Sequence, residues 1–74
     1  MSTVNVVECR SRIVGRGDTP VQAIANFHEE KFRFFIPDKG ITHKKPLVKP
    51  VDDYVLEPDD FFAVATVTGW VESS

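Results

Sequence analysis

Few side chains in this sequence are suited to acid–base or covalent chemistry. His28 is the candidate general base, and Cys9 and Ser11 are the candidate nucleophiles. No carboxylate is placed to orient His28, so the residue types define no catalytic triad. Cys9 lies in an apolar-rich segment, where a cysteine usually acts as an inert small hydrophobic residue. We therefore expect no catalytic residue and predict that the chain is not an enzyme.

Metal-binding patterns are equally sparse. The two histidines and the single cysteine have no spacing typical of a zinc site. The paired acids Asp52-Asp53 and Asp59-Asp60 carry the oxygen ligands that hard cations prefer, yet they do not form a loop with a calcium-binding pattern. Solvated turns explain them better. The sequence predicts no metal site and no cofactor.

Basic residues offer a candidate nucleic-acid surface. Arg10 and Arg12 alternate along a β-type segment, and Lys44, Lys45 and Lys49 follow in the segment Lys39–Lys49. They form one patch if that segment packs beside the strand that carries the arginines. Gly15 and Gly17 before a helix could hold a phosphate, but Asp18 beside them opposes an anion. A weak nucleic-acid binder is therefore one alternative.

Charge is divided unevenly along the chain. The net charge is −2, yet all nine basic residues precede residue 51. The charged residues of the segment 51–74 are all acidic. Two explanations stay open: the two parts neutralise each other in the fold, or the acidic part binds a partner with a basic surface. The second explanation, with the surplus apolar residues, gives a set of candidate partner-binding residues: Phe27, Phe34, Asp52, Asp53, Asp59, Asp60 and Trp70.

The size of the chain points to association. Its 74 residues make one domain, 1–74, and a domain of this size is only marginally stable alone. The lone cysteine excludes an internal disulfide and fits a reducing compartment. We therefore expect a homo-oligomer or a partner complex, with a cytoplasmic location. No apolar run approaches the ~20 residues of a membrane-spanning helix, so no membrane contact is expected.

Hydrophobic periodicity predicts one helix flanked by strands. The segment 4–14 alternates as a strand, with Val7, Cys9, Ser11 and Ile13 on its dry face, and Gly15 and Gly17 are expected to end it. Thr19, Pro20 and Gln22 form a capping box for a helix over 19–35. Its core face is expected to hold Val21, Ile24, Ala25, His28, Phe32 and Phe35. Ala23, Phe27 and Phe34 form a second apolar edge, which widens the stripe or faces another subunit.

The remaining elements complete a β-α-β-β order. The basic connection 37–50 contains prolines and lysines, which suit at most an edge strand. Strands are predicted over 51–56 and 61–71, joined by a turn at 57–60. The second of these is apolar on both faces, as expected for a central strand. The predicted fold class is two-layer α+β, with one helix packed on a small antiparallel sheet.

One stretch carries a family resemblance. In the segment 15–27, Gly17, Asp18, Thr19, Ala23 and Asn26 match the pattern G-D-T-x-x-x-A-x-x-N. This resembles the start of the helix in the N-terminal domains of HicB-like antitoxins. The resemblance implies a small α+β module that works by binding and by self-association. The β-α-β-β order is also similar to that of dodecins, which are small flavin-storing oligomers.

These observations give one preferred function and two alternatives. The preferred function is a small non-enzymatic protein-binding module, an inhibitor, adaptor or antitoxin-like partner, that acts through self-association and partner binding. The alternatives are a dodecin-like oligomer that binds a small ligand, and the nucleic-acid binder that uses Arg10, Arg12 and the segment 39–49.

Overall fold

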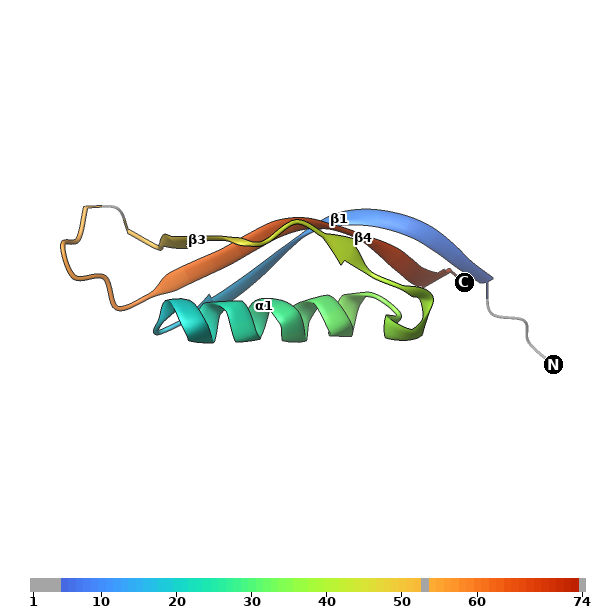
Figure 1. Ribbon diagram of the computed structural model, residues 1–74, viewed down its shortest axis with the longest axis horizontal. Helices are drawn as coiled ribbons and strands as arrows, with labels where there is room; N and C mark the ends of the chain where they lie inside the picture. Colours follow the sequence, from blue (N-terminus) through green and yellow to red (C-terminus); the bar gives the residue numbers. More distant parts are fainter. Residues whose placement is uncertain (1–4, 53, 74) are drawn as a thin grey trace.

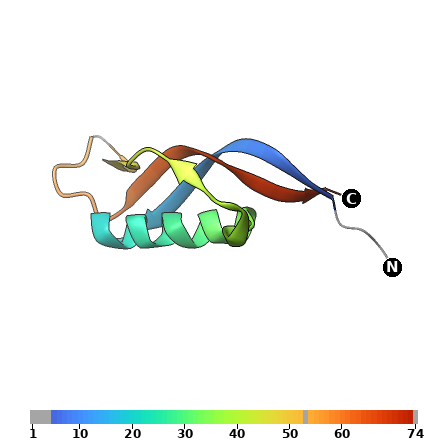
Figure 2. The same cartoon turned by 45° about the vertical axis from the view of Figure 1, so that its right-hand side comes forward.

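The computed structural model describes residues 5–52 and 54–73. It contains one α-helix, one turn of 3₁₀ helix and an antiparallel sheet. In chain order the elements are β1 (Asn5–Gly17), α1 (Pro20–Phe34), η1 (Pro37–Lys39), β2 (Thr42–His43), β3 (Leu47–Pro50) and β4 (Phe61–Ser73). The helix covers one face of the sheet, and no described element covers the other (Figures 1 and 2). The predicted two-layer α+β class is confirmed.

The two long strands form the frame of the sheet. β1 and β4 pair antiparallel without interruption, from Asn5 opposite Ser73 to Gly17 opposite Phe61. β2 and β3 both pair with the other edge of β4, so β4 is the central strand, as its two-sided apolar sequence predicts. The ends of β1 and β4 that lie beyond the helix form a twisted two-stranded ribbon (Figure 1).

The helix begins where the sequence predicts. Thr19 is the N-cap, and its hydroxyl oxygen accepts a hydrogen bond from the backbone N–H of Gln22 at 3.1 Å. Pro20 occupies the first turn, where its missing N–H leaves no donor unpaired. The helix ends at Phe34, and the N–H of Phe35 bonds to the carbonyl of Lys31.

The predicted core face of the helix was correct at Phe35 but wrong at Val21, Ala25 and Phe32, which are exposed. The buried helical residues are Ala23, Phe27 and Lys31, and Phe35 continues the same row, with all four spaced by one turn. Val21 and Phe32, which were expected inside, are 77% and 52% exposed. The sequence pattern did not predict this buried row because Lys31 lies in its middle. A charged residue within an apolar row makes that row resemble the border of the apolar face and not its centre.

Two glycines of β1 determine which face of the helix packs against the sheet. A Cβ built on Gly15 would overlap the backbone N of Phe27 and lie 2.5 Å from the carbonyl oxygen of Ala23. A Cβ on Gly17 would lie 2.5 Å from the backbone N of Ala23. These glycines therefore let the backbone of α1 approach the strand. They continue β1 instead of ending it, which corrects the predicted strand boundary.

The core lies between this helix face and the sheet. Ile13 from β1 and Ala63 and Val67 from β4 pack with the helical row, and Phe27 and Val67 are the largest fully buried side chains. Phe35 rests on Gly69, whose missing side chain leaves room for its ring. Val7 shares this side of the sheet but is 45% exposed, since it lies on the ribbon beyond the helix.

The described residues of the segment 51–56 form no strand, which corrects a second prediction. β3, inside the basic connection, already occupies the edge of β4 from Phe61 to Val64 that this segment would need. A carboxylate oxygen of Asp52 instead accepts a hydrogen bond from the backbone N–H of Tyr54, which forms a turn. The described part of 51–60 is a loop at one end of the molecule (Figure 1).

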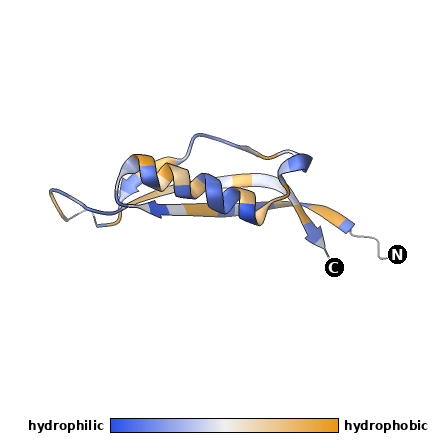
Figure 3. Cartoon of the chain, turned by 90° about the horizontal axis from the view of Figure 1, so that it is seen from below, coloured by the Kyte–Doolittle hydropathy of each residue, from blue (hydrophilic) through white to orange (hydrophobic). Residues whose placement is uncertain are grey.

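No described helix has the length and the apolar composition that crossing a bilayer requires. The helix α1 has 15 residues, and its second half carries the exposed charged side chains Glu29, Glu30 and Arg33. Figure 3, which views the molecule from the helix side, shows hydrophilic and hydrophobic segments interspersed along α1.

Replacing Thr19 by Ala should lower the free energy of unfolding by about 1 kcal/mol, because the N–H of Gln22 loses its acceptor. Thermal or urea unfolding followed by circular dichroism measures the loss. Thr19→Ser keeps the hydroxyl and should retain most of the stability. Equal stability of the Ala and Ser variants would contradict this capping role.

Gly15→Ala should destabilise the fold by about 1–3 kcal/mol or more, because the new methyl group meets helix backbone that cannot rotate away. Gly69→Ala is the matched control, since its Cβ meets only the ring of Phe35, 2.6 Å away. A side chain shifts more easily than a backbone, so the control should lose less stability in the same unfolding assay. The reverse order would show that the helix does not depend on close approach at Gly15.

Candidate functional site

The sheet face turned away from α1 carries the largest group of basic side chains. We call it the outer face; its side chains alternate with the buried Ile13, Ala63 and Val67. β1 contributes Arg10, Arg12, Val14 and Arg16, and β4 contributes Phe62, Val64, Thr66 and Thr68. Leu47 and Lys49 of β3 lie opposite Val64 and Phe62.

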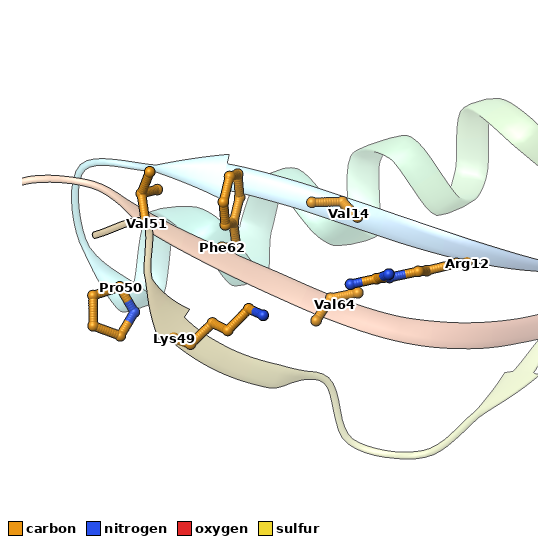
Figure 4. Close-up of a pocket in the computed structure, with 7 residues that line it drawn as sticks. All are labelled: Arg12, Val14, Lys49, Pro50, Val51, Phe62 and Val64. Atoms are coloured by element: carbon orange, nitrogen blue, oxygen red, sulfur yellow. The ribbon is translucent and has the colours of Figure 1, made fainter. Parts of the chain in front are cut away.

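A hollow of about 320 Å³ lies on this face between β1 and β3. Phe62 and Val64 of the intervening strand form its floor, together with Val14 (Figure 4). Arg12 and Lys49 stand on opposite sides of this apolar floor, as Figure 4 shows. No carboxylate is among its lining residues. The hollow thus combines an aromatic ring with two positive charges.

A second hollow of about 610 Å³ adjoins the first at Val64. Arg10 lines it from β1, and Lys44 and Lys45 line it from the connection between β2 and β3. That connection is a bulge: residues 44–46 stand against only residues 65 and 66 of β4. The bulge brings two consecutive lysines to one hollow.

Arg16 extends the basic surface past the first hollow. Its guanidinium lies 5.9 Å from the centre of the Phe62 ring, within the range of a cation–π contact. The same group bonds to a carboxylate oxygen of Asp60 at 2.8 Å. Both side chains are substantially exposed, so this pair adds little stability. The Arg16–Asp60 pair does link the segment 1–50, which contains all the basic residues, to the acidic segment 51–74.

The structure brings together five of the basic residues that the sequence proposed for nucleic acid, whereas Lys39 lies in η1 and lines neither hollow. Arg10, Arg12, Lys44, Lys45 and Lys49 line the two adjoining hollows. Phe62 and Val64, which were not predicted as site residues, are parts of the same surface. Their alternation with Ala63 and Ala65 was the signal, because every second residue of a strand shares a face.

The residues proposed for a protein partner are not brought together. Phe27 is fully buried in the core, so its assignment to a partner surface was wrong. Phe34 is 48% exposed near the end of α1, whereas Trp70 lies on the outer face, opposite Glu8. Asp52, Asp59 and Asp60 belong to the loop at the other end of the molecule, and Asp53 lies outside the described residues.

Lys31 is the one buried charged residue among those described. Its ammonium lies 3.0 Å from Nδ1 of His28 and 3.0 Å from Nε2 of His43. Nδ1 of His43 contacts the carbonyl oxygen of Lys44, which can only accept, so this nitrogen carries the proton and Nε2 accepts from Lys31. Two imidazole rings thus take the place of the carboxylate that usually accompanies a buried lysine.

This cluster is structural in its geometry. The rings of His28 and His43 pack edge-on against Phe27, with centroids 5.4 and 5.2 Å apart from it. Burial lowers the pKa of Lys31, and burial followed by the nearby positive charge of Lys31 lowers the pKa of His28. None of the hollows described above has Lys31 or His28 in its lining. His43, by contrast, is among the residues that line the second hollow.

The described residues contain no group of three or more His, Cys, Asp and Glu side chains placed to hold a metal ion. Cys9 is half-buried on the helix side of β1 and packs against the core. Comparisons of the chain with protein-family models, curated proteins and solved structures give no match. The resemblance to HicB-like antitoxins is therefore neither supported nor opposed by them.

Stability should fall as the pH is lowered from 7 through 6.5 and below. The pKa of His28 is lowered in the folded chain, so the unfolded chain takes up the proton first and gains stability relative to the fold. Thermal unfolding at pH 7, 6 and 5.5 measures this slope. His28→Gln keeps an acceptor for Lys31 but cannot titrate, so its slope should be smaller; an equal slope would contradict the role of His28.

Proposed function

We propose that the protein binds single-stranded nucleic acid through the outer face of its sheet, as a non-catalytic binding module. One observation carries the proposal. Five of the nine basic side chains line two adjoining hollows on this face, and no carboxylate lines either one. Such a concentration of positive charge favours a polyanionic ligand.

The shape of the surface favours a single strand. Arg10 and Arg12 are successive side chains on one strand face, about 6.7 Å apart along β1, so they follow an extended phosphate backbone. Phe62 lies between the basic side chains and offers a ring on which a base can stack. Bases of a duplex are already stacked on one another and cannot use this ring.

No carboxylate lines either hollow, and the two acids that the strands place on the outer face, Glu8 and Glu72, lie toward the far end of the β1–β4 ribbon. Glu29 and Glu30 pair with Arg33 on the exposed side of α1, at 3.0 and 3.2 Å. Asp52, Glu57, Asp59 and Asp60 belong to the described part of the loop 51–60, at one end of the molecule. The net charge of −2 therefore does not describe the field at the outer face. For the same reason we place a nucleic-acid ligand before the protein partner favoured by the sequence.

Binding to a labelled oligo(dT) of about 12 nucleotides, followed by fluorescence anisotropy across a salt series, tests the proposal. The wild-type affinity should fall as salt rises. Replacing Arg12 and Lys49 together by Gln should weaken binding and reduce the slope of log K against log salt by about 1.4, since each lost phosphate contact removes about 0.7. Phe62→Leu should weaken binding by about 1 kcal/mol or more with an unchanged slope.

Arg33→Gln is the matched control, because it removes one positive charge from the helix side of the molecule. It should bind like the wild type. Failure to bind oligo(dT) at low salt, or equal losses in the control and in the outer-face variants, would refute the proposal. Equal competition by polyglutamate would assign the surface to an acidic protein, and tighter binding of duplex would exclude base stacking on Phe62.

A further inference from the structure

The two edges of the sheet are protected very differently. At the β2–β3 edge, Lys44, Lys45 and Pro46 form the bulge and Pro50 ends β3, all of which oppose the addition of another strand. β1 has none of these features. Its 13 residues contain no proline, lysine or bulge, and no described strand pairs with its outer edge. Such a long, regular edge is a template for another strand.

The direction of the free backbone groups on β1 follows from one hydrogen bond. The carbonyl of Trp70 accepts from the N–H of Ile36, so the backbone of Trp70 points away from β1. Glu8 lies opposite Trp70, and this is therefore a non-hydrogen-bonded pair. The N–H and C=O of Glu8 consequently point to the free edge.

Because backbone N–H and C=O groups point to opposite edges at successive residues of a strand, the direction found for Glu8 applies to every second residue of β1. The free backbone groups on the edge are those of Val6, Glu8, Arg10, Arg12 and Val14. The next residue in the series, Arg16, confirms the direction, because its carbonyl accepts a hydrogen bond from the side chain of Asn26. The carbonyl of Arg16 is therefore already paired within the chain and is not free to bond to another strand. The open part of the described edge is thus centred on Arg10.

We propose that two copies of the chain pair through β1, antiparallel, about a two-fold axis at Arg10. This register uses every free backbone group from Val6 to Val14. It places Glu8 opposite the partner's Arg12 twice, once on each side of the axis, as opposite-charge pairs. It also places Val6 opposite the partner's Val14, and Val7 opposite the partner's Ile13.

Arg10 lies opposite its own copy, which is the one unfavourable pair of this register. The partner's Glu8 is its diagonal neighbour and lies within reach of a long side chain, which offsets the repulsion. The two-fold axis runs perpendicular to the sheet, so both helices lie on one side and both outer faces on the other. The pairing does not depend on nucleic-acid binding; it would join the two outer faces into one surface.

Light scattering of the purified chain over a concentration series, combined with charge-reversed variants, tests the pairing. The wild type should have the mass of a dimer. Glu8→Arg and Arg12→Glu should each weaken the dimer by about tenfold or more, because each change makes two like-charge pairs. The double variant restores both pairs in this register only, so it should recover the wild-type dimer.

Arg10→Pro tests the backbone of the edge without removing a bond inside one chain, because the N–H of Arg10 points outward. It should give a folded monomer, with folding checked by circular dichroism. Ser11→Pro is the matched control and should unfold the chain, since the N–H of Ser11 points to β4. A wild-type monomer at every concentration, or a dimer that survives both Glu8→Arg and Arg10→Pro, would overturn the inference. Oligo(dT) binding by a monomeric wild type would leave the proposed function standing alone.

Discussion

The close approach of α1 to β1 at Gly15 and Gly17 is the contact on which the rest of this structure depends. Without side chains at these positions, the helix backbone at Ala23 and Phe27 reaches the strand. This approach determines which side of the helix is buried, and therefore that Phe27 and Lys31 face the sheet while Val21 and Phe32 face solvent. In a chain of 74 residues, this single helix–sheet interface contains the whole core.

Burial of Lys31 is a direct consequence of that choice of face. An ammonium group in the core costs free energy unless it is hydrogen-bonded. His28, on the helix, and His43, on β2, accept from it at 3.0 Å and keep it paired. The short strand β2 is thus held at the sheet edge both by β4 and by the helix. Both histidines of the chain thus serve as partners of the buried Lys31.

With one helix, only one face of the sheet can be covered. The other face is left with Phe62 and Val64 among basic side chains contributed by β1, β3 and the bulge between β2 and β3. The same bulge protects its edge of the sheet through lysine and proline, whereas β1 presents a regular edge. The proposed binding surface and the proposed subunit contact are therefore neighbours. Arg10 and Arg12 contribute side chains to the surface and backbone groups to the subunit contact.

The sequence by itself determined the elements with strong local signals: the Thr19 cap, the helix that follows, the two long strands and the α+β class. Capping and alternation act between near neighbours, so they can be recognised in the sequence alone. Only the tertiary structure decided which face of the helix is buried and which segment pairs with the edge of β4. It also decided that Arg12 and Lys49 share one hollow with Phe62, and that Arg10, Lys44 and Lys45 line the hollow adjoining it. These outcomes depend on contacts between segments far apart in the chain: the glycines of β1 admit the helix, and β3 takes the place at β4 that was predicted for 51–56.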